Sequence, residues 1–171
     1  MSKILITYAT KTGSTSEIAR FIGDVLEDDG FAVDVSEIGE VVDLSGYQTV
    51  VIGSATRMDK VLNEAAKFML QHQKEFQHKT TAYFLVGVTM KEDNLENRQK
   101  AEATLAPLCE IKEPLSMGMF AGKLDYSKIG LFWRVLASKD KTGFMEEGDF
   151  RDWIKIKDWA VELVSLLRER G

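Results

Sequence analysis

The chain opens with an apolar strand pattern that runs directly into a hydroxyl-rich turn and then into an amphipathic helix. Residues 4–9 read Ile-Leu-Ile-Thr-Tyr-Ala, and residues 10–15 read Thr-Lys-Thr-Gly-Ser-Thr. The apolar residues that follow recur at helical spacing: Ile18, Phe21, Ile22, Val25 and Leu26. A strand joined to a helix by so short a turn predicts the first βα unit of an α/β domain.

The turn at residues 10–15 also has the composition of an anion-binding site. Backbone N–H groups at a helix N-terminus point outward, and the helix dipole favours negative charge there. Lys11 is the only cation of the turn, which also contains four hydroxyl donors: Thr10, Thr12, Ser14 and Thr15. This composition predicts a phosphate monoester that is held mainly by hydrogen bonds.

Two common phosphate loops do not match this turn. The Walker pattern places its lysine after the last glycine, but Lys11 precedes Gly13, and the dinucleotide fingerprint requires three glycines, of which only Gly13 is present. One alternative stays open, namely an ordinary capped helix without a ligand. In that case Ser14 or Thr15 is the N-cap and Glu17 is the capping-box acid.

The composition of the chain excludes several classes of protein. A chain of 171 residues suits one domain, and no apolar run is long enough to span a bilayer. The strand pattern begins at the N-terminus without a signal peptide, which predicts a cytoplasmic protein. Cys109 is the only cysteine, which excludes an internal disulfide, and the formal charge of −5 argues against a nucleic-acid partner. We expect no metal site, because His72 and His78 lack ligand spacing and are interpreted as surface residues.

Strand and helix patterns alternate along the remaining chain. The strand patterns cover residues 31–35, 49–54, 81–88 and 116–122, and the helix patterns cover residues 62–76, 94–108 and 153–168. Together with the first unit they predict a single doubly wound α/β domain over residues 1–171. Ligands of such sheets bind beyond the carboxyl ends of the strands, where we expect the loops 9–15, 54–61 and 87–94 to meet.

The run Thr10-Lys11-Thr12-Gly13-Ser14-Thr15, placed directly after the first strand, resembles the flavodoxin phosphate loop T/S-x-T-G-x-T. The resemblance implies a flavodoxin-like five-stranded parallel sheet of order 2-1-3-4-5 with helices on both faces, and FMN as the cofactor. It places the phosphate on residues 10–15 and the isoalloxazine ring between the loops after the third and fourth strands. The implied ring-binding residues are Ser54, Ala55, Thr56, Arg57, Met58, Gly87, Val88, Thr89 and Met90.

A second resemblance concerns the third strand and its loop. The run Val51-Ile52-Gly53-Ser54-Ala55-Thr56-Arg57 is similar to V-I-G-A-S-I-R of the menaquinone-dependent protoporphyrinogen oxidases, which carry an extra segment beside the last strand. The segment at about 123–151 is its counterpart here, and Asp152-Trp153 resembles the T-D-W-E-Q-V helix start of that branch. The chain departs from the bacterial oxidase in its acidic balance and in having Met58 in place of a tyrosine.

Several side chains of the ring loops have two interpretations. Met58 and Met90 can flank the ring with soft apolar faces, or they can fill gaps in the core. Arg57 can approach the pyrimidine edge of the ring or a substrate carboxylate, or it can be an exposed arginine without an ion pair. We interpret Asp59, Glu92 and Asp93 as solvated acids.

The segment at about 123–151 is rich in apolar side chains and cations. The apolar residues are Ile129, Leu131, Phe132, Trp133, Val135 and Leu136, and the cations are Lys123, Lys128, Arg134, Lys139 and Lys141. These apolar residues can cover one edge of the sheet. They can instead form a lid or docking surface near the flavin, for a redox partner protein, a quinone, a porphyrin-like substrate, a second copy in a homodimer or a membrane interface.

Two functions are consistent with these observations. The first is an FMN-dependent oxidoreductase that resembles protoporphyrinogen oxidase and passes reducing equivalents from a reduced substrate to a quinone or another acceptor. The second is a flavodoxin electron carrier that shuttles single electrons between redox proteins. Arg57 and the extra segment favour the enzyme, whereas the net charge and the acids near the ring loops favour the carrier. No catalytic residue is assigned, because the sequence has no Ser-His-Asp or Cys-His arrangement.

Overall fold

The computed structural model describes residues 2–171 and contains a central parallel sheet. Its strands are ordered β2-β1-β3-β5-β6. They comprise β1 (Lys3–Ala9), β2 (Ala32–Glu37), β3 (Thr49–Arg57), β5 (Thr80–Val86) and β6 (Met117–Phe120). A short strand, β4 (Lys60–Val61), folds back antiparallel on the end of β3. In chain order the five parallel strands are therefore arranged 2-1-3-4-5, which confirms the predicted doubly wound sheet.

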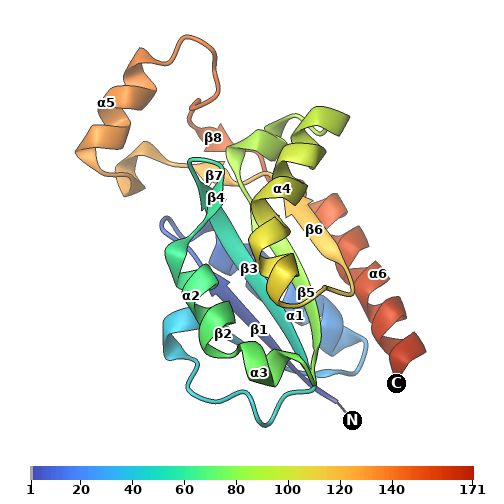
Figure 1. The fold of residues 1–171 in the computed structure, drawn as a ribbon. Coiled ribbons are helices and arrows are strands. Elements are labelled where there is room, and N and C mark those ends of the chain that lie inside the picture. Colours follow the sequence, from blue (N-terminus) through green and yellow to red (C-terminus); the bar gives the residue numbers. More distant parts are fainter. Residues whose placement is uncertain (1) are drawn as a thin grey trace.

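Helices cover both faces of the sheet (Figure 1). One face carries α1 (Ser14–Asp28) and α6 (Trp153–Arg170), and the other carries α2 (Asn63–Gln71), α3 (Gln73–Phe76) and α4 (Leu95–Ile111). Because side chains alternate along a strand, Ile4 and Ile6 enter the core under α1 and α6, whereas Leu5 enters the core under α2 and α4. Among residues 2–171 there is no helix with both the length and the apolar composition needed to cross a bilayer.

Two predicted elements differ in the structure. The helix expected at 62–76 divides at His72, whose φ of −103° and ψ of 14° interrupt the helical backbone. His72 is half-buried against Phe68 and its Nδ1 lies 2.7 Å from Glu75 Oε1, so its interpretation as a surface residue was wrong. The strand expected at 81–88 ends at Val86, and Val88–Lys91 form the 3₁₀ turn η2.

Gly53 lies at the centre of the sheet, where β3 passes the ring of Phe84. A Cβ atom at Gly53 would lie 2.0 Å from Phe84 Cζ, and Phe84 is fully buried. Overpacking of this kind costs about 1–3 kcal/mol or more. We therefore expect Gly53→Ala to lower Tm by several degrees in thermal unfolding. Gly39→Ala is the control, because no atom lies within 4 Å of its added Cβ, and equal Tm values for the two variants would contradict this packing argument.

The segment between β6 and α6 has two ends that pack onto the domain and a middle that projects from it. It contains β7 (Lys123–Leu124), the 3₁₀ turn η3 (Tyr126–Lys128), α5 (Leu131–Lys139) and β8 (Gly148–Asp149). Strands β7 and β8 pair with each other, and Phe150 packs against the core under α2 and α4. Helix α5 extends beyond the carboxyl edge of the sheet (Figure 1), with Leu131 77% exposed and Phe132 68% exposed. The interpretation that α5 covers a sheet edge was therefore wrong.

Candidate functional site

The turn between β1 and α1 is held in shape by its own polar groups. Gly13 has a φ of +93°, a left-handed conformation that glycine adopts without strain. The Gly13 amide donates to Thr10 Oγ1 at 3.0 Å, and Ser16 Oγ donates to the Gly13 carbonyl at 2.7 Å. Gly13 is the N-cap of α1, so the prediction of Ser14 or Thr15 as the cap was wrong. Both residues instead begin the helix, where they line the turn.

The first turn of α1 retains unused hydrogen-bond donors. Glu17 is the first residue whose amide bonds back, to the Gly13 carbonyl at 3.4 Å, and the amides before it have no intrahelical acceptor. The hydroxyl of Thr15 is fully buried and has no hydrogen-bond partner within residues 2–171, as is also true of Thr7 in β1. An unpaired buried hydroxyl costs about 1–3 kcal/mol, and an anion at the turn would supply an acceptor. The donor set therefore fits a phosphate monoester.

The sequence indicated Lys11 as the cation of the phosphate turn, but the structure places two other lysines in front of it. Lys11 Nζ lies 2.7 Å from Glu64 Oε1 in α2, so its ammonium is directed toward that helix. A small hollow lies in front of the turn, lined by Thr12, Gly13, Ser14, Glu17, Lys123, Asp125 and Lys128. Two lysines of the 123–151 segment thus reach the turn. Sequence reasoning did not place them there, because only their local basic composition was visible.

The loop after β3 is fixed by a buried serine. Ser54 Oγ accepts from the Leu62 amide at 3.0 Å and donates to the Ala55 carbonyl at 2.8 Å. Both hydrogen bonds of this hydroxyl are therefore made within the protein, and they fix the shape of the loop. The tip of the loop is formed by Met58 and Asp59, whose φ angles are +51° and +56°, and Met58 is 78% exposed.

The loop after β5 packs directly against the loop after β3. A Cβ atom at Gly87 would lie 2.2 Å from Thr56 Oγ1, so only glycine allows this approach. Val88 and Thr89 are half-buried, whereas Met90 is 7% exposed and belongs to the core under α2 and α4. Met90 thus fills a gap in the core, and of the two methionines only Met58 presents its side chain at the surface.

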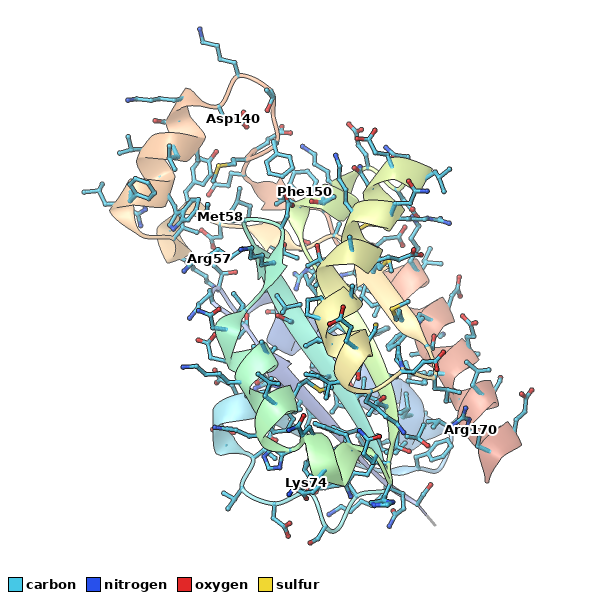
Figure 2. All side chains as sticks on the ribbon, in the orientation of Figure 1. Arg57, Met58, Lys74, Asp140, Phe150 and Arg170 are labelled. Carbon is cyan, nitrogen blue, oxygen red and sulfur yellow. The ribbon has the colours of Figure 1, made fainter. Side chains whose placement is uncertain are left out.

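The 123–151 segment contacts all three loops at the carboxyl edge of the sheet. The Arg57 guanidinium lies 5.5 Å from the ring centroid of Trp133 in α5. Lys91 Nζ lies 2.6 Å from Glu146 Oε2 and 4.2 Å from the ring centroid of Phe150. Arg151 forms an ion pair with Glu17, next to the phosphate turn. Figure 2 shows Arg57, Met58 and Phe150 at this edge, with Asp140 farther out at the end of α5.

A larger hollow lies between the turn η2, the end of β6 and the start of α6. Its floor includes Met119, Phe120 and Phe150, and its empty volume, open solvent included, is about 510 Å³. The cations at its rim are already paired, because Lys91 contacts Glu146 and Lys155 contacts Asp93. The hollow next to the phosphate turn is therefore the better candidate for binding an anion.

Asp93 is an ion-paired residue, and its interpretation as a solvated acid was wrong. It accepts from Arg98 Nη2 at 3.0 Å and also forms an ion pair with Lys155 of α6. The hydrogen bond from Arg98 and then that from Lys155 hold the pKa of Asp93 far below its ordinary value of 3.8. These contacts tie the loop after β5 to the start of α6.

Replacing Asp93 with asparagine should give a pH-dependent loss of stability. Since the pKa is lowered in the folded protein, the stabilisation is complete above the ordinary pKa of 3.8 and is lost as the pH falls through the folded value. We expect Asp93→Asn to cost about 0.5–1 kcal/mol at pH 7 in urea unfolding, with the difference narrowing from pH 5 toward pH 2. Glu92→Gln, at an exposed neighbour, is the control. If the loss of unfolding free energy in Asp93→Asn were the same at every pH, the ion pairs of Asp93 would not be its cause.

Comparisons with known proteins agree with this architecture. A family model described as a flavodoxin domain matches residues 5–140. The protoporphyrinogen IX dehydrogenase [quinone] of Escherichia coli K12 is 22% identical over 96% of both chains. The protein of the same name from Leishmania major is 26% identical over 96% of this chain and 75% of its own length.

Solved structures show the same fold. A flavodoxin from the domain Archaea superposes with a TM-score of 0.59 at 16% identity, over 97% of this chain and 99% of its own. A WrbA-like flavodoxin from Agrobacterium tumefaciens gives a TM-score of 0.60 at 12% identity and covers both chains completely. The sheet order, the hydroxyl-rich turn and the family match over most of the chain lead to one conclusion. The chain belongs to the flavodoxin domain family.

Proposed function

We propose that the chain is an FMN-dependent oxidoreductase that passes reducing equivalents from a porphyrin-like reduced substrate to a quinone. The FMN phosphate is assigned to residues 10–15, and the ring to the space beside residues 54–58 and 87–90. The similarity to the two protoporphyrinogen IX dehydrogenases supports the choice of substrate and acceptor. When bound, FMN would supply the redox chemistry by accepting two electrons from the substrate and giving them to the quinone.

The observation that carries this proposal is the position of the 123–151 segment. A single-electron carrier needs an exposed flavin edge for its protein partners. Here Trp133 stands beside the β3 loop, Glu146 beside the β5 loop and Lys123 beside the phosphate turn. In the proposed site, the segment would be a fourth wall and the three loops would be the others. A walled site suits a small substrate that must be oriented against the ring.

Arg57 is the side chain best placed to bind an anionic substrate. Its guanidinium lies 5.5 Å from the ring centroid of Trp133, and Arg57 forms no ion pair within residues 2–171. Because no carboxylate of these residues pairs with it, its N–H donors remain available for a substrate carboxylate. Met58, which is exposed on the same loop, offers a soft apolar surface to a flat ring.

The second candidate is an electron carrier. The formal charge of −5 and the exposed acids Asp59 and Glu92 favour docking to basic redox proteins. A probable flavodoxin of Bacillus subtilis is 35% identical over 79 residues, or 45% of this chain. The two candidates differ in the number of electrons that the bound flavin exchanges at once.

A potentiometric titration followed by the visible spectrum separates the two functions. The FMN-loaded protein is titrated without oxygen, first alone and then with protoporphyrinogen IX. If the protein is the proposed enzyme, we expect the bound flavin to take up both electrons in one step and protoporphyrinogen IX itself to bleach the flavin. Two well-separated single-electron steps, with no bleaching by protoporphyrinogen IX, would support the carrier and reject the enzyme.

A further inference from the structure

We propose that Lys123 and Lys128 supply the positive charge that holds the phosphate of the bound mononucleotide. The inference rests on the proposed function, since it takes FMN as the ligand, and it assigns to the inserted segment a part in retaining the cofactor. Lys11, the lysine within the phosphate turn, is instead paired with Glu64 of α2.

Both lysines are positioned next to the turn by local structure. Lys123 begins β7 directly after Gly122, and a Cβ atom at Gly122 would lie 3.5 Å from Ser14 Oγ. The pairing of β7 with β8 fixes the direction of this strand. Lys128 ends the turn η3, and its amide donates to the Asp125 carbonyl at 3.0 Å. The two side chains line the same hollow as Thr12, Gly13 and Ser14.

The acids around the hollow are engaged by other groups. Glu17 forms an ion pair with Arg151, and the hydrogen bond from Arg151 is the main reason that the pKa of Glu17 is lowered. Asp125 accepts from the amide and the hydroxyl of Ser127 at 2.9 and 2.6 Å. Neither Lys123 nor Lys128 forms an ion pair within the part of the chain that the structure describes. The charges of both lysines help to lower the pKa values of Glu17 and Asp125 from a distance, but no contact within residues 2–171 holds their ammonium groups in place, so an anion at the turn can attract them.

The expected contribution is moderate and depends on salt. Both side chains are exposed, and an exposed ion pair changes an equilibrium by about one- to fivefold. For a doubly charged phosphate and two ammonium groups, we expect a change in affinity of about fivefold or more, because hydrogen bonds between charged groups are stronger than neutral ones. Removal of both charges should therefore weaken FMN binding roughly fivefold to twentyfold at low ionic strength, and salt should reduce the difference.

The test compares FMN with riboflavin, which has the same ring but no phosphate. Dissociation constants are measured by flavin fluorescence for the unmodified protein and for the double variant Lys123→Gln/Lys128→Gln, at low and high sodium chloride. The matched control is Lys139→Gln/Lys141→Gln, which changes the net charge equally at the far end of the segment. Circular dichroism verifies that each variant is folded.

We expect the Lys123/Lys128 variant to lose FMN affinity and its salt dependence while its riboflavin affinity and the control variant stay unchanged. An equal loss of FMN and riboflavin would overturn the inference, because the lysines would then act on the shape of the site. Unchanged FMN affinity in the double variant would also overturn it. If the unmodified protein binds neither flavin, the proposed function itself fails, a result distinct from the other two.

Discussion

Replacing residues 129–145 with a short Gly-Ser turn should reduce the turnover of a reduced porphyrin at least tenfold and weaken FMN binding by about fivefold at most. The change removes α5 and with it the contact of Trp133 with Arg57. Substrate orientation contributes several kcal/mol to catalysis, so the loss of one wall is costly. The cut leaves Phe150 in the core and Lys123 in β7. It removes Arg134, which donates to the carbonyls of Tyr126 and Ser127, so the turn that carries Lys128 loses part of its support.

The structure shows that this deletion can be closed. Tyr126 donates its hydroxyl to the Met145 carbonyl at 2.7 Å, and its amide donates to Glu147 Oε1 at 3.0 Å, so the two ends of the removed segment are neighbours. Anaerobic turnover and FMN affinity are measured on the same preparation. Leu131→Ser is the control, since it removes an exposed apolar side chain and leaves the Trp133 contact in place. Full turnover in the shortened protein would contradict the role of the segment as a wall of the site, and unfolding would show that the segment is needed for a stable domain.

The double variant Thr12→Val/Thr15→Val should bind FMN at least tenfold more weakly. Each valine removes one hydroxyl donor from the turn, and a hydrogen bond to a charged acceptor contributes about 1.5–3 kcal/mol. A tenfold change in affinity corresponds to about 1.4 kcal/mol, so the free energy lost with two such hydrogen bonds is more than enough for a tenfold loss. Thr12→Ser/Thr15→Ser retains both hydroxyls and should retain the affinity.

The stability of the flavin-free protein distinguishes binding from a structural role. Thr15 Oγ1 is buried without a partner, so its replacement by a methyl group should leave the free energy of unfolding unchanged or raise it. Weaker FMN binding combined with unchanged or higher stability is the expected result in urea unfolding and flavin titration. Unchanged FMN affinity in the valine variant would remove the turn from the binding site.

The sheet could be predicted from sequence because its signals are local. The continuous apolar run at 49–54 and the helical spacing after Gly13 depend only on neighbouring residues, and both elements are present in the structure. The break at His72 was missed, because the spacing of the apolar residues continues through it and no glycine or proline marks it. The residues that His72 contacts there, Phe68 and Glu75, lie within four residues of it along the chain.

For the candidate site, the loops could be predicted from the sequence, but the partners of their charged side chains could not. The composition of residues 10–15 indicated an anion-binding turn. The partners of the charged side chains were not visible, because Lys11 pairs with Glu64, 53 residues away, and Lys91 pairs with Glu146, 55 residues away. Pairings at such distances follow from the folded topology and leave no pattern in a single sequence. For the same reason, the sequence does not reveal that the hydroxyl of Ser54 accepts from the Leu62 amide.

The most direct test of the proposed enzyme is rapid mixing of the FMN-loaded protein with protoporphyrinogen IX in the absence of oxygen, followed by addition of a quinone. Flavin absorbance reports the redox state of the cofactor, and porphyrin fluorescence reports the product. We expect protoporphyrinogen IX to bleach the flavin, the colour to return when the quinone is added, and porphyrin to accumulate over repeated turnovers. A flavin that stays oxidised with protoporphyrinogen IX, yet exchanges single electrons with a redox protein, would contradict the proposed function.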